Sequence, residues 1–340
     1  MATTSRVQKR PVARLELFSH LLVNTELSLN DINSKLHPSV LQVGLWINRG
    51  IVTMPNTRCE VMLQAFKEMM SSYEGSDDKD LRRDLEAKLR PHISFLTKCR
   101  PMSVSMKNAI KFIRLTISNL DPLLAREDAK KQVMDAIDNF IHTRIKLAVE
   151  EISKHVGERI HNGDVIVIYA GSQAVETALV DAHCAGTKFS VIVLDSNPLH
   201  LGRALTKRLS KHGIACSYSL IGGAEYVMKD ATKVFLGAHT FFANGHMMAP
   251  AGSSIVAMVA KRRGIPVMVC CETYKFCAER VQTDSFVFNE LDNPDKRVVN
   301  LVFDVTPPDF IDMIVTEIGC VPCTSIPVII REHGVGTTLF

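Results

Sequence analysis

The chain has 340 residues, with 40 lysines and arginines against 36 aspartates and glutamates, and its net charge is only +4. This length allows a large core and two domains, and a small charge without a long basic block gives no reason to expect direct nucleic-acid binding. No apolar run approaches the roughly 20 residues that a membrane-spanning helix needs, so no membrane association is expected.

The nine cysteines are odd in number and scattered through apolar runs. This pattern indicates reduced, mostly buried thiols in a cytoplasmic protein, not a disulfide framework. Cys320 and Cys323 form a CxxC pair, but a zinc knuckle would need a second such pair. We therefore expect neither a metal nor a cofactor. The basic segment 1–35 has no signal-like apolar core and is expected to be a short solvated N-terminal segment.

Residues 36–160 show the periodicity of a helical domain. A polar loop near 71–80 separates its first two helices, and Pro91 is expected to interrupt or bend the second of them. Serine side chains are good N-caps and mark the start of a third helix. The expected helices cover 58–73 and 81–96, and a third starts at Ser103 or Ser105.

The longest predicted helix runs from about Arg126 to His155. Its apolar stripe fits a straight amphipathic helix better than a strict heptad seam. This half of the chain is either a bundle packed on itself or a bundle that also recognises a partner with part of its surface. The stripe consists of Val133, Ile137, Ile141, Ile145, Ala148, Ile152 and Val156.

After residue 160, short β-branched runs alternate with helical stretches over 161–340. The runs are apolar in both phases, as expected of strands that are covered on both faces. This alternation predicts an α/β domain with a Rossmann-like, doubly wound and mostly parallel sheet. The expected strands are 164–170, 189–195, 214–220, 233–238, 265–271 and 300–305.

The loops after these strands should meet at the carboxyl edge of the sheet, where open α/β folds bind ligands. Gly171 and Ser172 precede a helix, so they form either a phosphate-binding turn or a plain tight turn. Asp195 ends the second strand, where it could hold a ribose hydroxyl or cap the next helix. Asn244 and Gly245 mark a turn that needs a positive φ angle.

The segment after the fifth strand, CCETYKFCAERVQTDSFVFNEL (270–291), is unusually polar for a strand end. Its polar and charged side chains could bind a ligand phosphate, or they could pair with one another or at a subunit interface. Cys271 could act as a nucleophile only if a distant histidine reached it. The groups concerned are Glu272, Tyr274, Lys275 and Arg280.

This segment and SFLTKCRPMSVSMKNAIKF (94–112) resemble the alpha, beta and delta subunit family of eukaryotic translation initiation factor 2B, most specifically its delta group. The likeness extends into the segment NLVFDVTPPDFIDMIVTEIGCVPCTSIPVI (300–329). It implies an N-terminal helical domain followed by a Rossmann-like domain.

The same fold occurs in methylthioribose-1-phosphate and ribose-1,5-bisphosphate isomerases, and GAHTFFANGHMMAPAGSS (237–254) resembles one of their motifs. Three chemical groups of those enzymes are replaced here. Their acidic aspartate corresponds to His239, their strand-end cysteine to Ile168 and a lysine to Pro250. The resemblance therefore implies a protein that is not an enzyme. A sugar-phosphate isomerase, or a module that senses sugar phosphates or nucleotides without turnover, is the alternative.

The resemblance implies a non-catalytic regulatory subunit of a cytoplasmic guanine-nucleotide exchange factor. Its implied partners are the alpha, beta, gamma and epsilon subunits of that factor, together with initiation factor 2. It would bind initiation factor 2 through that factor's alpha subunit and sense the phosphorylation of that subunit.

Two groups of residues correspond to contact positions of the family. Arg83, Thr143 and Leu147 would contact the alpha subunit of initiation factor 2, although Thr143 stands where the family commonly has a glutamate. Leu15, Leu17 and Val299 would lie near the seam between the beta and delta subunits, where a small regulatory ligand can bind.

Overall fold

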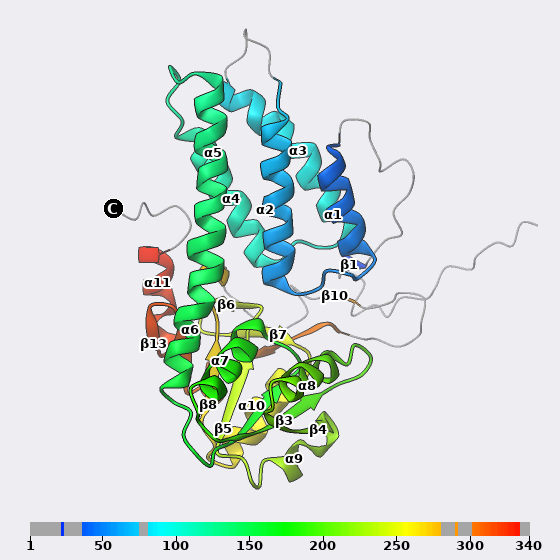
Figure 1. Cartoon of the computed structure of the whole chain (residues 1–340), viewed down its shortest axis with the longest axis vertical. Coiled ribbons are helices and arrows are strands. Elements are labelled where there is room, and N and C mark those ends of the chain that lie inside the picture. The colour runs from blue at the N-terminus through cyan, green and yellow to red at the C-terminus, as the bar shows by residue number, and fades with distance from the viewer. Residues whose placement is uncertain (1–21, 24–35, 75–80, 280–289, 292–300, 334–340) are drawn as a thin grey trace, which may run out of the picture.

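The computed structural model describes residues 22–23, 36–74, 81–279, 290–291 and 301–333. Figure 1 shows the helical part of the chain at the top and the α/β part below it, with one long helix running through both. The N-terminal helical domain and the mostly parallel sheet agree with the fold expected from the sequence.

Five helices share one core of apolar side chains, and the last of them is the first part of the long helix. The predicted loop breaks are present, but the helix that contains Pro91 continues through it without interruption. The proline ring is half-buried. The helices are α1 (Pro38–Asn48), α2 (Pro55–Ser71), α3 (Leu81–Cys99), α4 (Val104–Ser118) and α5 (Arg126–Phe140).

The long helix continues from α5 through a π-helical segment, η3 (Ile141–Leu147), into α6 (Ala148–Gly157). Every residue of the predicted stripe is buried. The π turn was not predicted, although the stripe contained a sign of it. Five of the six intervals between successive stripe residues are four residues long, whereas an α-helical turn has 3.6 residues. A wider π-helical turn brings residues at this spacing back to one face of the helix.

The main sheet has seven strands in the order β13-β12-β8-β5-β2-β3-β4. All neighbours are parallel except β13, which runs antiparallel to β12. From β4 to β12 this is the order of a classical dinucleotide-binding sheet, with its switch point between β2 and β5. The strands are β2 (Val165–Tyr169), β3 (Ser190–Asp195), β4 (Ala215–Leu220), β5 (Lys233–Gly237), β8 (Val267–Cys270), β12 (Met313–Thr316) and β13 (Gly319–Val321).

The sixth predicted strand belongs to a different sheet. Its residues form β11 (Phe303–Thr306), which pairs antiparallel with β7 (Met247–Pro250), and these two strands are continued by β6 (Thr240–Phe242) and β9 (Phe276–Cys277). The last parallel place in the main sheet is taken by β12, which the sequence analysis did not assign. A two-residue ladder between β1 (Leu22–Val23) and β10 (Glu290–Leu291) completes the pairing.

Helices cover both faces of the main sheet. On one face, α6, α7 (Gln173–Cys184) and α8 (Leu201–Lys211) enclose alternate strand residues such as Ile166 and Ile168. The opposite face packs against α9 (Ala224–Val227), α10 (Ser253–Arg262) and α11 (Ile326–His333). Short 3₁₀ turns lie at Ile221–Gly223, Thr273–Lys275, Pro308–Phe310 and Cys323–Ser325.

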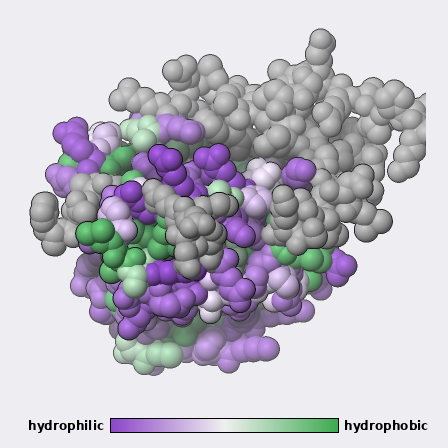
Figure 2. All heavy atoms as spheres, turned by 90° about the horizontal axis from the view of Figure 1, so that it is seen from above, coloured by the Kyte–Doolittle hydropathy of each residue, from purple (hydrophilic) through white to green (hydrophobic). Residues whose placement is uncertain are grey.

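Seen from the end that carries the helical domain, the described surface is mainly hydrophilic, with separate hydrophobic patches (Figure 2). Within the described ranges, no helix combines the length and the apolar character that crossing a bilayer requires.

Candidate functional site

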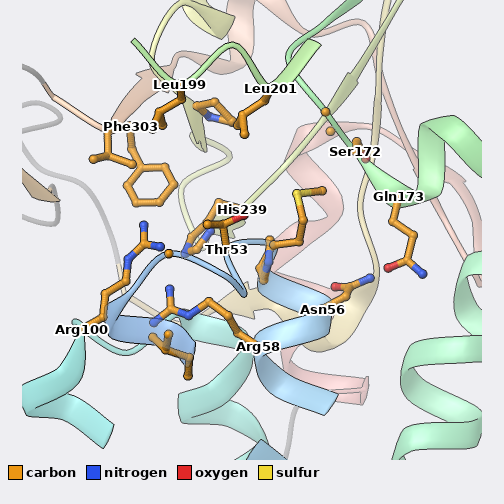
Figure 3. Close-up of a pocket in the computed structure, with 18 of the residues that line it drawn as sticks. Thr53, Asn56, Arg58, Arg100, Ser172, Gln173, Leu199, Leu201, His239 and Phe303 are labelled. Carbon is orange, nitrogen blue, oxygen red and sulfur yellow. The ribbon is translucent and has the colours of Figure 1, made fainter. Parts of the chain in front are cut away.

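A cavity of about 300 Å³ lies between the helical domain and the carboxyl edge of the main sheet. Its sheet side is formed by the segments that follow β2 and β5, which is the switch point where this fold usually binds ligands. Its other side is formed by the end of α1, the start of α2 and Arg100. Figure 3 shows Arg58 and Arg100 on the helical side, with Leu199 and Leu201 on the opposite wall.

The backbone of β5 passes very close to the start of α7. A Cβ atom on Gly237 would lie 2.3 Å from the Cβ of Ser172, closer than real side chains approach, so this position requires glycine. Ser172 is the N-cap residue of α7, and the helix therefore directs its first backbone N–H groups and its partial positive charge toward the cavity.

Three cationic side chains surround His239. Its ring is buried and packs against the ring of Phe303, with 4.5 Å between the centroids. Burial, together with the charges of Arg58, Lys275 and Arg100, lowers the pKa of His239 to about 3. His239 is consequently neutral at physiological pH, and it cannot supply the proton that an acid catalyst would deliver.

A buried polar network lies behind the cavity and connects the helical domain to the α/β domain. Glu272 is fully buried, and it pairs with Lys275 at 2.5 Å and accepts a hydrogen bond from the Asn56 amide at 2.6 Å. The Tyr274 hydroxyl donates to the Asn56 side-chain oxygen at 2.8 Å, and its ring packs in the core of the helical domain. Asn108 donates to the backbone carbonyl of Tyr274 at 2.8 Å.

The structure brings four of the eight predicted ligand-edge residues together at the cavity. Gly171, Ser172, His239 and Lys275 all line the cavity. Glu272 does not line it but holds Lys275 from behind. For this segment, the interpretation that its charged groups pair with one another is therefore confirmed for Glu272 and Lys275.

Other predicted residues lie elsewhere. Asn244 and Gly245 occupy the turn between β6 and β7 and do not line the cavity, although Gly245 has the positive φ angle, 85°, that the sequence predicted. Gly245 instead sits against Cys323 and Pro308. Arg280, Leu15, Leu17 and Val299 lie outside the described residues.

Asp195 is buried at the end of β3 and accepts hydrogen bonds from the backbone N–H groups of Ser196 and Arg203. This geometry matches the helix-capping interpretation, because Arg203 lies in the first turn of α8. Cys271 is fully buried, and burial raises the pKa of its thiol well above the usual value, so it is no thiolate nucleophile. Cys320 and Cys323 are both free thiols.

The three predicted partner contacts are on the helical domain, away from the cavity. Arg83 is exposed in the first turn of α3. Thr143 and Leu147 both belong to the π-helical segment, where Thr143 is exposed and Leu147 half-buried. The Thr143 hydroxyl donates to the backbone carbonyl of Asn139 at 2.7 Å.

Sequence reasoning missed the helical side of the site. Arg58 is only 1% exposed, and its guanidinium donates to the backbone carbonyl of Pro101 at 2.7 Å. The available signal was an arginine on the apolar face of a helix, one turn before the buried Met62. Arg100 was inside a recognised motif, but nothing in its spacing indicated that it would face the sheet. Phe303 was missed because its strand was assigned to the wrong sheet.

This arrangement favours binding an anion over catalysing a reaction. Arg49, Arg58 and Arg100 give the lining a positive charge, and the start of α7 adds to it. Among the described residues that line the cavity there is no aspartate, glutamate or cysteine. Nor do the described parts of the chain contain a group of three or more side chains suited to hold a metal ion.

Comparison with known proteins places these features in a family. Residues 52–323 match the initiation factor 2 subunit family. The chain is 35% identical to the delta subunit of translation initiation factor eIF2B from Schizosaccharomyces pombe, over 97% of this chain and 76% of that protein. It is 37% identical to the corresponding subunit from Dictyostelium discoideum, over 94% of this chain but only 56% of that protein.

Two further similar proteins are an enzyme and a chain of a solved complex. A ribose 1,5-bisphosphate isomerase from Pyrococcus furiosus is 32% identical over 74% of this chain and 82% of that enzyme. Among solved structures, a tetrameric eIF2B complex of two beta and two delta subunits from C. thermophilum contains a chain that superposes with a TM-score of 0.84 at 34% identity. That match covers 89% of this chain and 97% of the other.

Proposed function

Because this chain belongs to the initiation factor 2 subunit family, we propose that it acts as a non-catalytic regulatory subunit of the guanine-nucleotide exchange factor eIF2B. In this role it binds the alpha subunit of initiation factor 2 and responds to that subunit's phosphorylation. Its similarity to two delta subunits over nearly its whole length supports the assignment to eIF2B. Binding and phosphorylation sensing go beyond that similarity and rest on the residues below.

The observation that supports the proposal most directly is the set of side chains at the cavity. It has the position and charge of a phosphate site, yet the groups that correspond to reactive side chains of the isomerases have been replaced. His239 is neutral, Ile168 is a buried strand residue that packs beneath α7, and Pro250 offers no side-chain proton. Lys275 is neutralised by Glu272. A scaffold that works by contacting other proteins fits this arrangement better than an enzyme does.

The partner surface that we propose includes the π-helical segment. Thr143 and Leu147 lie one π turn apart on it, and the basic side chain of Lys146 beside them reaches Glu60 of α2 at 3.5 Å. π-helical turns often occur at functional sites, because they change the direction of side chains along an otherwise regular helix. Arg83 on α3 would extend this surface with a second positive charge.

Assembly with the beta subunit, and through it with alpha, gamma and epsilon, is part of the same proposal. The complex of two beta and two delta subunits contains a chain of the same fold. The α/β domain exposes large apolar side chains that another subunit could cover. Ile255 and Met258 on α10 are 48% and 47% exposed, and Val328 on α11 is 45% exposed.

We predict that Arg83→Glu weakens binding of the assembled complex to the alpha subunit of initiation factor 2 about tenfold, because reversing one exposed charge at an interface costs on the order of 1–2 kcal/mol. The measurement is a titration of wild-type and variant complexes with fluorescently labelled partner. Arg90→Glu, two turns further along the same exposed face of α3, is the matched control. Equal affinities for wild type and Arg83→Glu would reject this site.

A second candidate function is binding of a sugar phosphate or nucleotide without turnover. The specific observation in its favour is that Arg58 and Arg100 line the same cavity as the start of α7. Isothermal titration with ribose 1,5-bisphosphate and methylthioribose 1-phosphate, followed by assays for isomerised product, separates the possibilities. Binding without product supports the second candidate. Turnover that His239→Ala abolishes would overturn the assignment as a non-enzyme.

A further inference from the structure

The seven-stranded sheet has one long edge strand, β4. It pairs with β3 on one side, and none of the described residues pairs with its other side. Edge strands usually avoid adding a foreign strand by means of charged residues, prolines or short length. The sequence of β4, ACSYSL, has no charge and no proline over six residues, and Tyr218 and Leu220 are 39% and 45% exposed. This edge is therefore open to another chain.

A strongly basic helix borders this edge. Between residues 196 and 224 there are four lysines and arginines and no acidic residue. Arg208 is occupied by Glu176 of α7, with nitrogen–oxygen distances of 2.5 and 2.8 Å. Arg203, Lys207 and Lys211 are exposed, and among the described residues they form no ion pair. The nearest acid at the strand end, Asp195, is buried and accepts a hydrogen bond from the Tyr218 hydroxyl at 3.1 Å.

The three cations and the strand edge form one surface. Arg203, Lys207 and Lys211 line a hollow of about 460 Å³ together with Thr206, Ser210 and Tyr218. Cys216, two residues before Tyr218, packs in the core beneath α8, so the even-numbered residues of β4 face this helix. The odd-numbered residues face the opposite side of the sheet.

The spacing of the cations matches an extended peptide. Positions four apart on an α-helix are separated by about 6 Å along its axis, and alternate residues of a β-strand are separated by about 6.7 Å. An added strand with acidic residues at every second position would therefore place successive carboxylates beside Lys211, Lys207 and Arg203. We propose that the β4 edge and α8 bind an extended acidic peptide segment of another protein by strand addition.

The same charges argue against two other occupants. Two copies of this chain pairing through β4 across a twofold axis would bring two basic α8 helices side by side, and like charges in contact oppose that pairing. A nucleic acid would be attracted by the cations but would make no use of the unpaired backbone groups of β4.

The test uses the full chain and two synthetic peptides of identical composition. In the first, Thr-Glu-Val-Glu-Val-Glu-Thr, the acids alternate; in the second, Glu-Glu-Glu-Thr-Val-Val-Thr, they form a block. Binding is measured by fluorescence anisotropy, and amide hydrogen exchange is followed over residues 215–220. The proposal expects the alternating peptide to bind at least tenfold more tightly and to protect these amides.

Charge-reversal variants and alternative binding partners distinguish the proposal from its alternatives. The double variant Lys207→Glu/Lys211→Glu should lose at least tenfold in affinity, and the control Lys131→Glu/Arg262→Glu, on exposed sites of α5 and α10, should bind normally. Equal binding of the two peptides would overturn the proposal, since the surface would then respond to charge alone. Exclusive binding of polyuridylate, or concentration-dependent dimers that a Tyr218→Lys change disrupts, would overturn it in favour of RNA or self-pairing.

Discussion

His239 shows how burial determines which chemistry a side chain can perform. By residue type alone it is a candidate acid or base, and the sequence left that role open. The structure buries its ring near Arg58, Lys275 and Arg100, and burial together with these positive charges lowers its pKa and keeps the imidazole neutral. The same type of residue on an exposed surface would titrate near neutral pH.

This environment predicts a pH dependence of stability. The pKa of His239 is about 3 in the folded protein and near 6.5 when unfolded, so the unfolded state binds more protons between these values. The contribution of the neutral ring is complete above pH 6.5 and is lost as the pH falls toward 3. His239→Gln should lower the pH midpoint of acid unfolding, monitored by circular dichroism, by roughly half a unit.

The control is His212→Gln on the exposed end of α8, which should leave the acid midpoint unchanged. If His239→Gln unfolds at the same pH as the wild type, the ring is more accessible to protons than its burial indicates.

At the level of single residues, sequence reasoning succeeded where local chemistry decides. The Asn244–Gly245 turn needed only the backbone preference of glycine, and it has the expected positive φ. Arg58 could not be assigned in this way, because its role depends on which sheet loops the helical domain covers. That information comes from contacts between distant parts of the chain.

Among the elements, the long helix links the two cores. Its residues up to Ile145 pack in the helical core, and those from Ile152 onward pack beneath the sheet. The π-helical segment contains Ile141 and Ile145, the last of its residues in the helical core, and it ends where the helix leaves that core. The apolar stripe predicted one buried face but did not show that the face has two different neighbours.

The strand assignments show a similar limit. Segment 300–305 had the composition of a parallel strand, yet β11 pairs with β7, where the carboxylate of Asp304 accepts hydrogen bonds from Gly252 and Ser254 at the start of α10. β12 was missed because its apolar run follows shortly after two prolines and two acidic residues that resemble a loop. Strand pairing depends on partners that no local window contains.

Packing between α1 and α3 allows a matched pair of glycine substitutions. A Cβ on Gly44 would lie 2.3 Å from Phe95 Cε1 and 2.8 Å from Cys99 Sγ. We expect Gly44→Ala to reduce the free energy of unfolding by about 1–3 kcal/mol, as overpacked cores do. Denaturant unfolding followed by circular dichroism measures the change.

Gly157→Ala, in the last turn of α6, is the counterpart, because its added Cβ would meet no heavy atom within 4 Å apart from its chain neighbours and its own helix backbone. It should stabilise the chain by about 0.5–1 kcal/mol through the lower entropy of the unfolded state. If both substitutions change the free energy of unfolding equally, the close approach of α1 and α3 does not determine the cost of adding a side chain at position 44.

Across the whole molecule, the helical and α/β parts are held together by the long helix and by one buried network. Tyr274 inserts into the helical core, Asn56 connects it to Glu272, and Asn108 holds the backbone of the same segment. The cavity lies beside this network. The network therefore connects the helical core directly to the segment that follows β8.

The central claim is that the chain acts as a regulatory subunit of eIF2B and not as an isomerase. The direct measurement is release of labelled GDP from initiation factor 2 by complexes reconstituted with and without this chain, in the presence of unphosphorylated or phosphorylated alpha subunit. We expect the chain alone to release no GDP and the complex containing it to be inhibited by the phosphorylated partner. Complexes without the chain should lose this inhibition. A chain that stays outside the complex and converts ribose 1,5-bisphosphate on its own would contradict the account.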